Sequence, residues 1–504
     1  MFRRVFLLLL VSTAAVAQTP REAVHAYVAA HERDILREYV ELLAIPNVAA
    51  DQPDIRRNAE HIVTMLQKRG VQARLLETGG SPLVYGELTT AGASHTLAIY
   101  AHYDGQPVNA AQWKSPPWKP VLRDGTLDKG AKEIALDAAP ASVPDERRLY
   151  ARSASDDKAP IEAVMAALDA LRTTGAKPSI NLKFLFEGEE EAGSTHLAAA
   201  MKQYDTLLKA DAWLLCDGPV HQTRRMQLYF GARGVTDVEM TVYGPTRPLH
   251  SGHYGNWAPN PAIMLAQLLA GMRDDRGNVK IAGWYDEVRA LTASEKQALA
   301  AMPPVDQQLE HELGLARTEG EPEPLAMRIM RPGLNVRGIQ SGNVGDKAQN
   351  AIPTEARASI DFRLVPEQSP EHIRQLVENH IRSHGYFIVH AAPTPEERLE
   401  RPKIVRLDWG EGYPAARTSM DLPVSRAVVK TIEKTLGAPI IRMPMLGGSV
   451  PMYLFLERAP VIGLPIVNHD NNQHAADENL RLQNLWDGIE IFGGVISGLG
   501  AEWK

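Results

Sequence analysis

The stretch INLKFLFEGEEEAGS, residues 180–194, joins an apolar strand-like run directly to three consecutive glutamates. Two other runs end in polar residues in the same way, TLAIYAHYDGQ at residues 96–106 and WLLCDGP at residues 213–219. Open α/β sheets place their functional sites just beyond the carboxyl ends of their strands. The sequence therefore predicts an α/β domain whose central strands end at one shared site.

Five segments of the chain place histidine or carboxylate side chains where a metal could bind. They are AHYDGQ (residues 101–106), SASDDKAP (153–160), EGEEEAGS (187–194), CDGP (216–219) and NNQHAADEN (471–479). Imidazole and carboxylate groups are ligands of Zn²⁺, Mn²⁺ and Co²⁺, and a pair of such ions needs about five or six of them. We therefore expect two divalent metal ions in each chain, with Zn²⁺ as the leading candidate and Mn²⁺ or Co²⁺ as alternatives.

Each segment also has an ordinary structural interpretation. Adjacent aspartates such as Asp156 and Asp157 often cap a helix, and a run of glutamates is usually a solvated surface. His474 and Glu478 are four residues apart, as in a helical pair. The glutamates, however, directly follow a strand-like run, and Asp217 ends a buried strand, where an unpaired carboxylate is costly. Metal binding accounts for all the segments together.

Length and charge restrict the classes of protein that remain. The chain has 504 residues, is 44% hydrophobic and 23% charged, and exceeds the size at which a single core usually divides. Its 54 basic and 61 acidic residues give a net charge of −7 with no basic tract, so nucleic acid is not an expected partner.

The first residues have the order of a cleavable secretory signal. MFRR is followed by an apolar stretch at residues 5–11 and by small residues that end at Ala17. The apolar stretch is too short to span a bilayer, so we expect a signal peptide at residues 1–17, a secreted or periplasmic location and no membrane anchor. Because Cys216 is the only cysteine, an intrachain disulfide is impossible.

The order of helices and strands predicts one domain inserted within another. From residue 18 to about 230 helices and strands alternate, as in an open mixed α/β sheet covered on both faces. Residues 231–417 follow a βαββαβ order, typical of a ferredoxin-like α+β unit, with a polar, proline-containing insertion at about residues 274–332. The α/β pattern resumes over residues 418–504.

Taken in order, the five segments resemble the dinuclear zinc exopeptidase family that includes carnosinase-like dipeptidases, glutamate carboxypeptidase and aminoacylase. SASDDKAP and EGEEEAGS are the most specific parts of this resemblance. It implies that Glu190 is the general base and that Asp156 bridges two metal ions. Asp104 would orient His102 through its second ring nitrogen. The implied metal ligands are His102, Asp156, Glu191, Asp217 and His474.

Further motifs of this family occur outside the five segments. The HSG motif contributes the lid residue His250, the RLVP motif the substrate-binding Arg363, and the Gly-Gly-Ser loop Gly448 and Ser449. In the resembled family the inserted domain serves as lid and dimer contact, and its histidine acts in the neighbouring subunit. The resemblance therefore implies a homodimer with composite sites.

These features predict metal-dependent hydrolysis of an amide bond next to a free carboxylate, by a dipeptidase or a carboxypeptidase. Glu190 can carry a proton from water to the leaving amine, and the Arg363 fork suits a substrate carboxylate. One alternative is an N-acyl amino acid amidohydrolase or deacetylase that uses the same site. Another is a noncatalytic metal-dependent binding protein, but a binder needs no base, so Glu190 beside Glu191 disfavours it.

Overall fold

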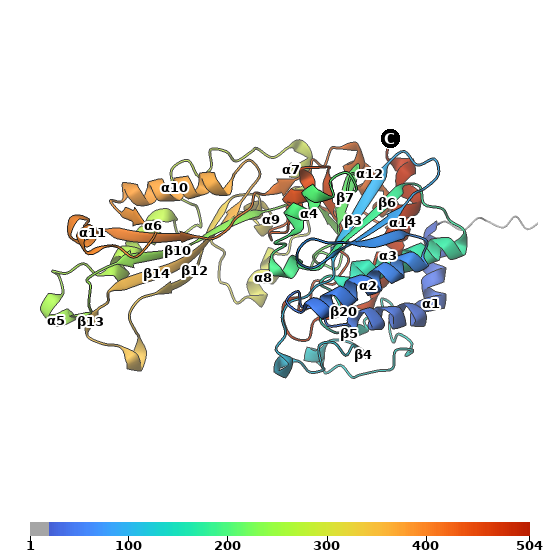
Figure 1. Ribbon diagram of the computed structural model, residues 1–504, viewed down its shortest axis with the longest axis horizontal. Helices are drawn as coiled ribbons and strands as arrows, with labels where there is room; N and C mark the ends of the chain where they lie inside the picture. The colour runs from blue at the N-terminus through green and yellow to red at the C-terminus, as the bar shows by residue number, and fades with distance from the viewer. Residues whose placement is uncertain (1–19) are drawn as a thin grey trace, which may run out of the picture.

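The computed structural model describes residues 20–504, and the expected signal peptide at residues 1–17 lies outside the described residues. Figure 1 shows two bodies of structure that lie side by side along the long axis, each organised around its own β-sheet. The larger body contains both the first and the last helices of the described chain, whereas the smaller body contains part of its middle.

The larger body is built on an eight-stranded mixed sheet. Its spatial order is β1 (Gln72–Leu76), β2 (Leu83–Leu88), β6 (Asn181–Glu187), β3 (Thr96–His102), β7 (Ala212–Leu215), β19 (Val461–Gly463), β8 (Gln227–Tyr229) and β18 (Ile441–Met443). The central pairs β6–β3, β3–β7 and β7–β19 are parallel, whereas β1–β2, β2–β6 and β19–β8 are antiparallel. The prediction of an open mixed α/β sheet is confirmed.

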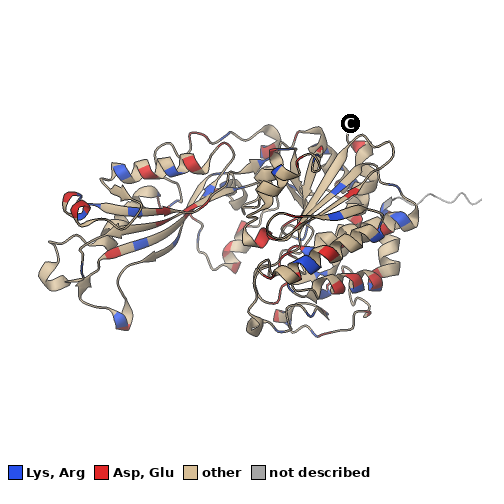
Figure 2. Cartoon of the chain, in the orientation of Figure 1, with Lys and Arg blue, Asp and Glu red and all other residues tan. Residues whose placement is uncertain are grey.

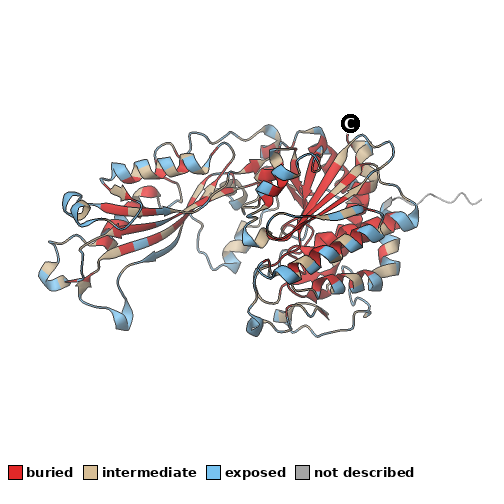
Figure 3. Cartoon of the chain, viewed as in Figure 1, coloured by how far each residue is buried: buried red, intermediate tan, exposed pale blue. Residues whose placement is uncertain are grey.

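Alternate side chains of the central strands enter two different cores. In β3, Leu97 and Ile99 belong to the core on one face of the sheet, and Ala98 and Tyr100 to the core on the other. This follows from the two-residue repeat of a strand. Because both faces are covered, the central strands are almost continuously apolar, and Figure 3 shows them as almost wholly buried.

Helices cover both faces of this sheet. The larger core is formed with α1 (Pro20–Leu43), α2 (Gln52–Lys68), α3 (Lys158–Thr174), α12 (Pro423–Leu436) and α14 (Leu482–Glu502). The opposite face carries α4 (Leu197–Gln203) and α13 (Met452–Leu456). Local sequence sets the limits of α3: Pro160 lies in its first turn, where a missing N–H costs little, and Gly175 ends it in the left-handed region at φ 74°.

The smaller body is built on a five-stranded sheet with a separate apolar core. Its spatial order is β12 (Gly333–Gln340), β14 (Glu355–Leu364), β10 (Gly234–Tyr243), β16 (Ile404–Trp409) and β15 (Phe387–Val389). Helices α6 (Pro261–Met272) and α10 (Pro370–Ser383) pack against it. The βαββαβ order is present as β10, α6, β12, β14, α10 and β15. Strand β16 was not predicted; it takes the place beside β10, and β15 lies outside it in parallel.

Two short segments connect the bodies. Strands β9 (Gly231–Ala232) and β17 (Ala416–Arg417) pair antiparallel where the chain leaves and re-enters the larger body. The backbones are so close here that a Cβ on Gly234 would lie 2.5 Å from the carbonyl oxygen of Tyr413. This crossing therefore requires glycine.

The remaining elements are short. Helices α7 (Ala293–Ala300), α8 (Asp306–Glu312) and α9 (Leu325–Ile329) lie in the predicted insertion, and α7 contacts β18 of the larger sheet. A three-stranded sheet contains β4 (Val121–Arg123), β5 (Arg148–Tyr150) and β20 (Asn479–Arg481). The others are β11 (Leu249–His250), β13 (Ala351–Ile352), α5 (Ser251–Tyr254), α11 (Pro395–Glu400) and the 3₁₀ turns η1 (Ala110–Gln112), η2 (Leu127–Lys129), η3 (Glu190–Ala192) and η4 (Gly345–Lys347).

Charged residues of both signs are mixed along the outer faces of the helices, and the central strands of the larger sheet carry few of them (Figure 2). Over residues 20–504, no helix combines the length and the apolar character needed to cross a membrane.

Candidate metal and peptide-binding site

Parallel strands bring the first part of the site together. In the β3–β6 pair His102 lies opposite Glu187, and in the β3–β7 pair Tyr100 lies opposite Leu215. The three strands therefore end side by side, and the segments that follow them begin at the same edge of the sheet. This is the edge at which open α/β sheets hold their sites.

Five side chains from separate segments approach one another at this edge. His102, Asp156 and Asp217 form one group and Asp156, Glu191 and His474 a second, with the candidate ligand atoms of each group within 4.8 Å of one another. Asp156 belongs to both: its Oδ1 lies 2.9 Å from His102 Nε2 and its Oδ2 lies 3.0 Å from His474 Nε2. These are the five residues that the resemblance implied as metal ligands.

The site is closed at one end and open at the other. The His102 side chain is 1% exposed, whereas that of His474 is 53% exposed. His474 also lies 3.3 Å from Glu191 Oε2, measured from its Nε2. The neighbouring His469 lines a different cavity, so it is His474 that the fold brings to Asp156.

Asp104 connects the two ends of the site. Its Oδ1 lies 3.4 Å from His102 Nδ1, the ring nitrogen that faces away from Asp156. Its carboxylate also accepts hydrogen bonds from the backbone N–H groups of Glu190 (3.1 Å) and Glu191 (3.0 Å). Asp104 therefore holds the histidine ring and the glutamate turn in one arrangement. Only the first of these contacts was predicted.

Glu478 organises the turn that carries Asp156, a role the sequence did not indicate. Its buried carboxylate accepts hydrogen bonds from the backbone N–H groups of Ser153, Ser155 and Asp156, each at 2.9 Å. Arg152 Nη1 donates to it at 2.7 Å. The interpretation of Glu478 as a helical partner of His474 is wrong, because residues 471–478 do not form a helix.

The cluster concentrates negative charge in a buried space. Burial, together with the charge of Asp156, raises the pKa of Asp217 to about 6 and that of Glu191 to about 7. Burial also raises the pKa of Glu190 well above its usual value. Buried carboxylates this close need compensating positive charge, and the carboxylate and imidazole donors are those that divalent transition metals accept. The residues therefore fit a pair of divalent cations that share Asp156.

The smaller sheet contributes a guanidinium next to the Gly-Gly-Ser loop of the larger body. Arg363, near the end of β14, donates from Nη1 to Ser449 Oγ at 2.9 Å, and its Nη2 lies 3.5 Å from Asp361 Oδ2. Burial raises the pKa of Tyr413, the charge of Glu190 adds to this, and a hydrogen bond with Ser449 opposes it. Tyr413 thus contacts the Arg363–Ser449 pair through Ser449 and responds to the charge of Glu190.

His250 is not part of this group. It lies in β11, beside β13 and α5 at the far end of the smaller body (Figure 1), and it is exposed. Its ring packs against His253 at a centroid distance of 4.5 Å, and its Nδ1 accepts a hydrogen bond from the Gly252 N–H at 3.1 Å. Within one chain, the fold does not bring His250 to the metal-binding residues.

Comparison with known proteins places the chain in a peptidase family. The chain belongs to peptidase family M20/M25/M40, whose pattern matches residues 98–498. It is 26% identical over 476 residues to the Cys-Gly metallodipeptidase dug1 of Schizosaccharomyces pombe, covering 89% of this chain and 92% of that protein. It is 23% identical over 500 residues to the Beta-Ala-His dipeptidase of Homo sapiens, covering 94% and 91%.

A solved structure supports the same assignment. The M20 family metallo-carboxypeptidase Sso-CP2 from Sulfolobus solfataricus superposes with a TM-score of 0.74 at 27% identity, over 93% of this chain and 99% of that chain. The protein is therefore a metal-dependent peptidase, as the sequence predicted.

The predicted secreted or periplasmic location is wrong. The fungal Cys-Gly metallodipeptidases that align with most of this chain are cytosolic. The prediction rested on the composition of residues 1–17 alone, which lie outside the described residues.

Proposed function

We propose that this peptidase cleaves the amide bond next to a free α-carboxylate, with dipeptides as its principal substrates. The observation that carries the proposal is the contact of Arg363 with Ser449 beside Tyr413, whose pKa is raised by the charge of Glu190. A base and a carboxylate-binding fork around one tyrosine favour substrates whose scissile bond is the last one. The dipeptidases among the relatives support the same substrate class.

Two divalent ions would be held by the two groups of side chains that share Asp156, with Zn²⁺ as the leading candidate and Mn²⁺ or Co²⁺ as alternatives. Once bound, such ions polarise a carbonyl and make water more acidic. His102 would be fixed in orientation by Asp104, and Glu191 by Gln106, whose Nε2 donates to Glu191 Oε2 at 2.7 Å.

Glu190 is proposed as the general base. Its backbone N–H donates to Asp104, and burial raises the pKa of its carboxyl well above the usual value, which makes the carboxylate a stronger proton acceptor. It would accept a proton from water at one carboxylate oxygen and deliver it to the nitrogen of the leaving amine. Arg363 and Ser449 meanwhile would hold the substrate carboxylate through charge-assisted hydrogen bonds, and the Gly448 backbone would leave room for it.

The test is hydrolysis by zinc- or manganese-loaded protein of dipeptides, of their C-terminal amides and of N-acetyl amino acids. We expect dipeptides to be cleaved fastest. Glu190→Gln should lower turnover by about 10²–10⁴-fold. Glu189→Gln is the matched control, because Glu189 bonds to His196 at 2.8 Å instead of facing the metal-binding residues. Faster cleavage of N-acetyl amino acids would identify a deacylase instead.

We further propose that residues 231–417 form a ferredoxin-like lid and dimerisation domain, inserted between residues 18–230 and 418–504 of the catalytic domain. Its outer end carries apolar side chains in water: Trp257 is 79% exposed, Val344 87% and Ile339, on the edge strand β12, 64%. Exposed apolar residues on an edge strand are typical of an interface. A homodimer would cover them.

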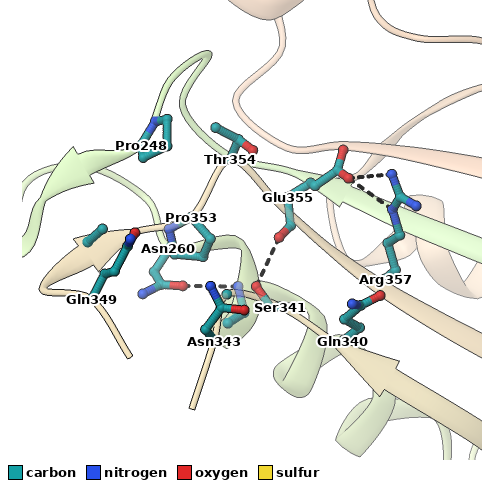
Figure 4. Close-up of a pocket in the computed structure, with 13 residues that line it drawn as sticks. Pro248, Asn260, Gln340, Ser341, Asn343, Gln349, Pro353, Thr354, Glu355 and Arg357 are labelled. Atoms are coloured by element: carbon teal, nitrogen blue, oxygen red, sulfur yellow. Dashed lines mark hydrogen bonds and ion pairs between the residues drawn. The ribbon is translucent and has the colours of Figure 1, made fainter. Parts of the chain in front are cut away.

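The same end of the domain contains a polar hollow of about 500 Å³ beside the β11–β13 pair that carries His250 (Figure 4). Ser341 Oγ donates to the Glu355 carbonyl oxygen there at 2.9 Å, and Glu355 pairs with Arg357. This end lies far from the metal-binding residues of its own chain. We propose that His250 of the partner subunit completes the site, which would make the dimer the active unit.

Mixing inactive chains tests the composite site. Glu190→Gln and His250→Ala chains, mixed under conditions in which differently tagged subunits are shown to exchange, should regain part of the activity, because a mixed dimer contains one intact site. If the subunits are shown to exchange and no activity returns, His250 acts within its own chain or has no role in the reaction.

A further inference from the structure

An apolar cavity of about 480 Å³ lies between the edge of the larger sheet and the inserted segment at residues 274–332. The wall on the sheet side contains Met443, Met445 and Leu446, at and just beyond the end of β18. The opposite wall contains Met302 and Ile329, from the end of α7 and from α9. Contact between α7 and β18 holds the two walls together.

This cavity adjoins the site at three points. Pro219, in its lining, follows Asp217 by two residues, and Leu446 precedes Ser449 by three. The Ile329 side chain lies 3.1 Å from the position that a Cβ on Gly447 would occupy, so it packs directly on the Gly-Gly-Ser loop.

The third point is the strand that carries the guanidinium. Two residues beyond Arg363, Val365 packs in one apolar cluster with Leu299 and Met445, both of which line the cavity. Residues of the cavity lining therefore lie within two or three positions of Asp217 and Ser449, and Val365, two residues beyond Arg363, packs against the lining.

The lining selects apolar groups. At one polar end, His221 Nδ1 lies 2.8 Å from Thr223 Oγ1, and Gln227 Nε2 donates to the Pro219 carbonyl oxygen at 2.8 Å. Among the described residues, Gln227 Oε1 has no hydrogen-bond partner. Burial lowers the pKa of His221, and the nearby His469 lowers it further, which disfavours a positive charge on this ring. The remaining wall is largely aliphatic and thioether, and methionine side chains adapt to apolar groups of different shape.

We propose that this cavity receives the side chain of the substrate's C-terminal residue, whose carboxylate Arg363 binds, and that it favours large aliphatic residues such as leucine and methionine. The inference rests on the proposed function. The cavity has the size of a small-molecule pocket, and one of its walls is formed by the insertion. In this view the insertion determines the specificity of the enzyme.

The test compares Ala-Leu with Ala-Gly, which share a scissile bond and differ only in the side chain that would enter the cavity. We expect kcat/KM for Ala-Leu to exceed that for Ala-Gly by at least about ten-fold. Met302→Gln with Ile329→Gln, which changes the side-chain volumes little but makes the wall polar, should bring the ratio close to one. Ala326→Phe, which fills the cavity, should do the same. Leu313→Asn, at a 66% exposed position of the insertion that does not line the cavity, should leave the ratio unchanged.

The ratio is measured on one preparation, so a smaller fraction of folded enzyme cancels from it. Equal rates on the two dipeptides in the wild type, or an unchanged ratio in both cavity variants, would overturn the inference while leaving the proposed function standing. No cleavage of either dipeptide would overturn the proposed function and the inference with it. Free leucine should also inhibit hydrolysis of Ala-Gly more strongly than free glycine does, and equal inhibition would count against the cavity.

Discussion

The turn that carries Asp156 depends on a single buried carboxylate, so the variant Glu478→Gln is a stringent test of the structure. Glu478 Oε1 accepts from the N–H groups of Ser155 and Asp156, and its Oε2 accepts from the Ser153 N–H and from Arg152. Glutamine has almost the same shape but replaces one of these oxygens by an NH₂ group. In either orientation of the amide, two of the four donors would face another donor.

The expected cost follows from these contacts. A buried donor left without an acceptor costs about 1–3 kcal/mol, so two of them cost about 2–6 kcal/mol. Loss of the negative charge beside the buried Arg152 adds to this cost. The sum is a large part of the total stability of about 5–15 kcal/mol that is usual for a folded protein. Because the same bonds position Asp156, metal content should fall together with stability.

Urea unfolding and metal analysis of the purified protein measure both effects. The matched control is Glu77→Gln, which removes a carboxylate paired with Arg56 at 2.7 and 2.9 Å but on the surface, where both side chains are largely exposed. The control should lose no more than about 1 kcal/mol. If Glu478→Gln lost no more than the control and kept two ions per chain, the assigned role of Glu478 would be refuted.

Three further variants test other parts of the structure. Asp156→Ala should lower both metal content and melting temperature, because it removes the carboxylate shared by the two groups; two ions per chain in metal analysis would exclude the bridging role. Arg363→Met should raise KM for dipeptides by about ten-fold or more and much less for their C-terminal amides, and equal losses in steady-state kinetics would make Arg363 structural. Burial raises the pKa of Glu162 well above its usual value, and its oxygens have no hydrogen-bond partner within residues 20–504. The folded state therefore keeps a proton that the unfolded chain releases above about pH 4.3, and wild-type stability falls as pH rises. Glu162→Met has no carboxyl at this position and should not show this loss. The unfolding free energies of the two proteins, plotted against pH, should therefore diverge by up to about 1.4 kcal/mol per pH unit. Parallel plots would contradict a buried neutral carboxyl.

Local sequence determined the central strands β3, β6 and β7 of the larger sheet and the positions at which they end, but not the strands β8, β18 and β19. The apolar runs within residues 96–106 and 180–194 form β3 and β6. Helix α3 begins at Lys158, inside the SASDDKAP motif. These features depend on periodicity, turns and caps within a few residues of chain, which can be read without knowing the fold. The motifs were also sufficient to predict a metal-dependent peptidase.

Strand β16 and Glu478 were beyond the reach of such reasoning. The IVRLDW run of β16 is short, and only its pairing with β10, more than 150 residues earlier, makes it a strand. Glu478 is likewise defined by partners more than 300 residues away. Sequence spacing carries no information about contacts of this kind, because packing of the whole chain creates them.

The sequence by itself thus determined which residues could hold metal and which chemistry they could serve. Only the tertiary structure decided that His474, and not His469, lies next to Asp156. It also decided that His250 lies at the outer end of the smaller body, away from the metal-binding residues of the same chain. It also decided that the polar insertion folds back on β18 to enclose an apolar cavity beside Arg363. The physical reason is that the type of metal-donor atom and the local conformation depend on each residue and its near neighbours in sequence. Distances between remote segments depend instead on the burial of two separate cores and on the β9–β17 connection between the two bodies.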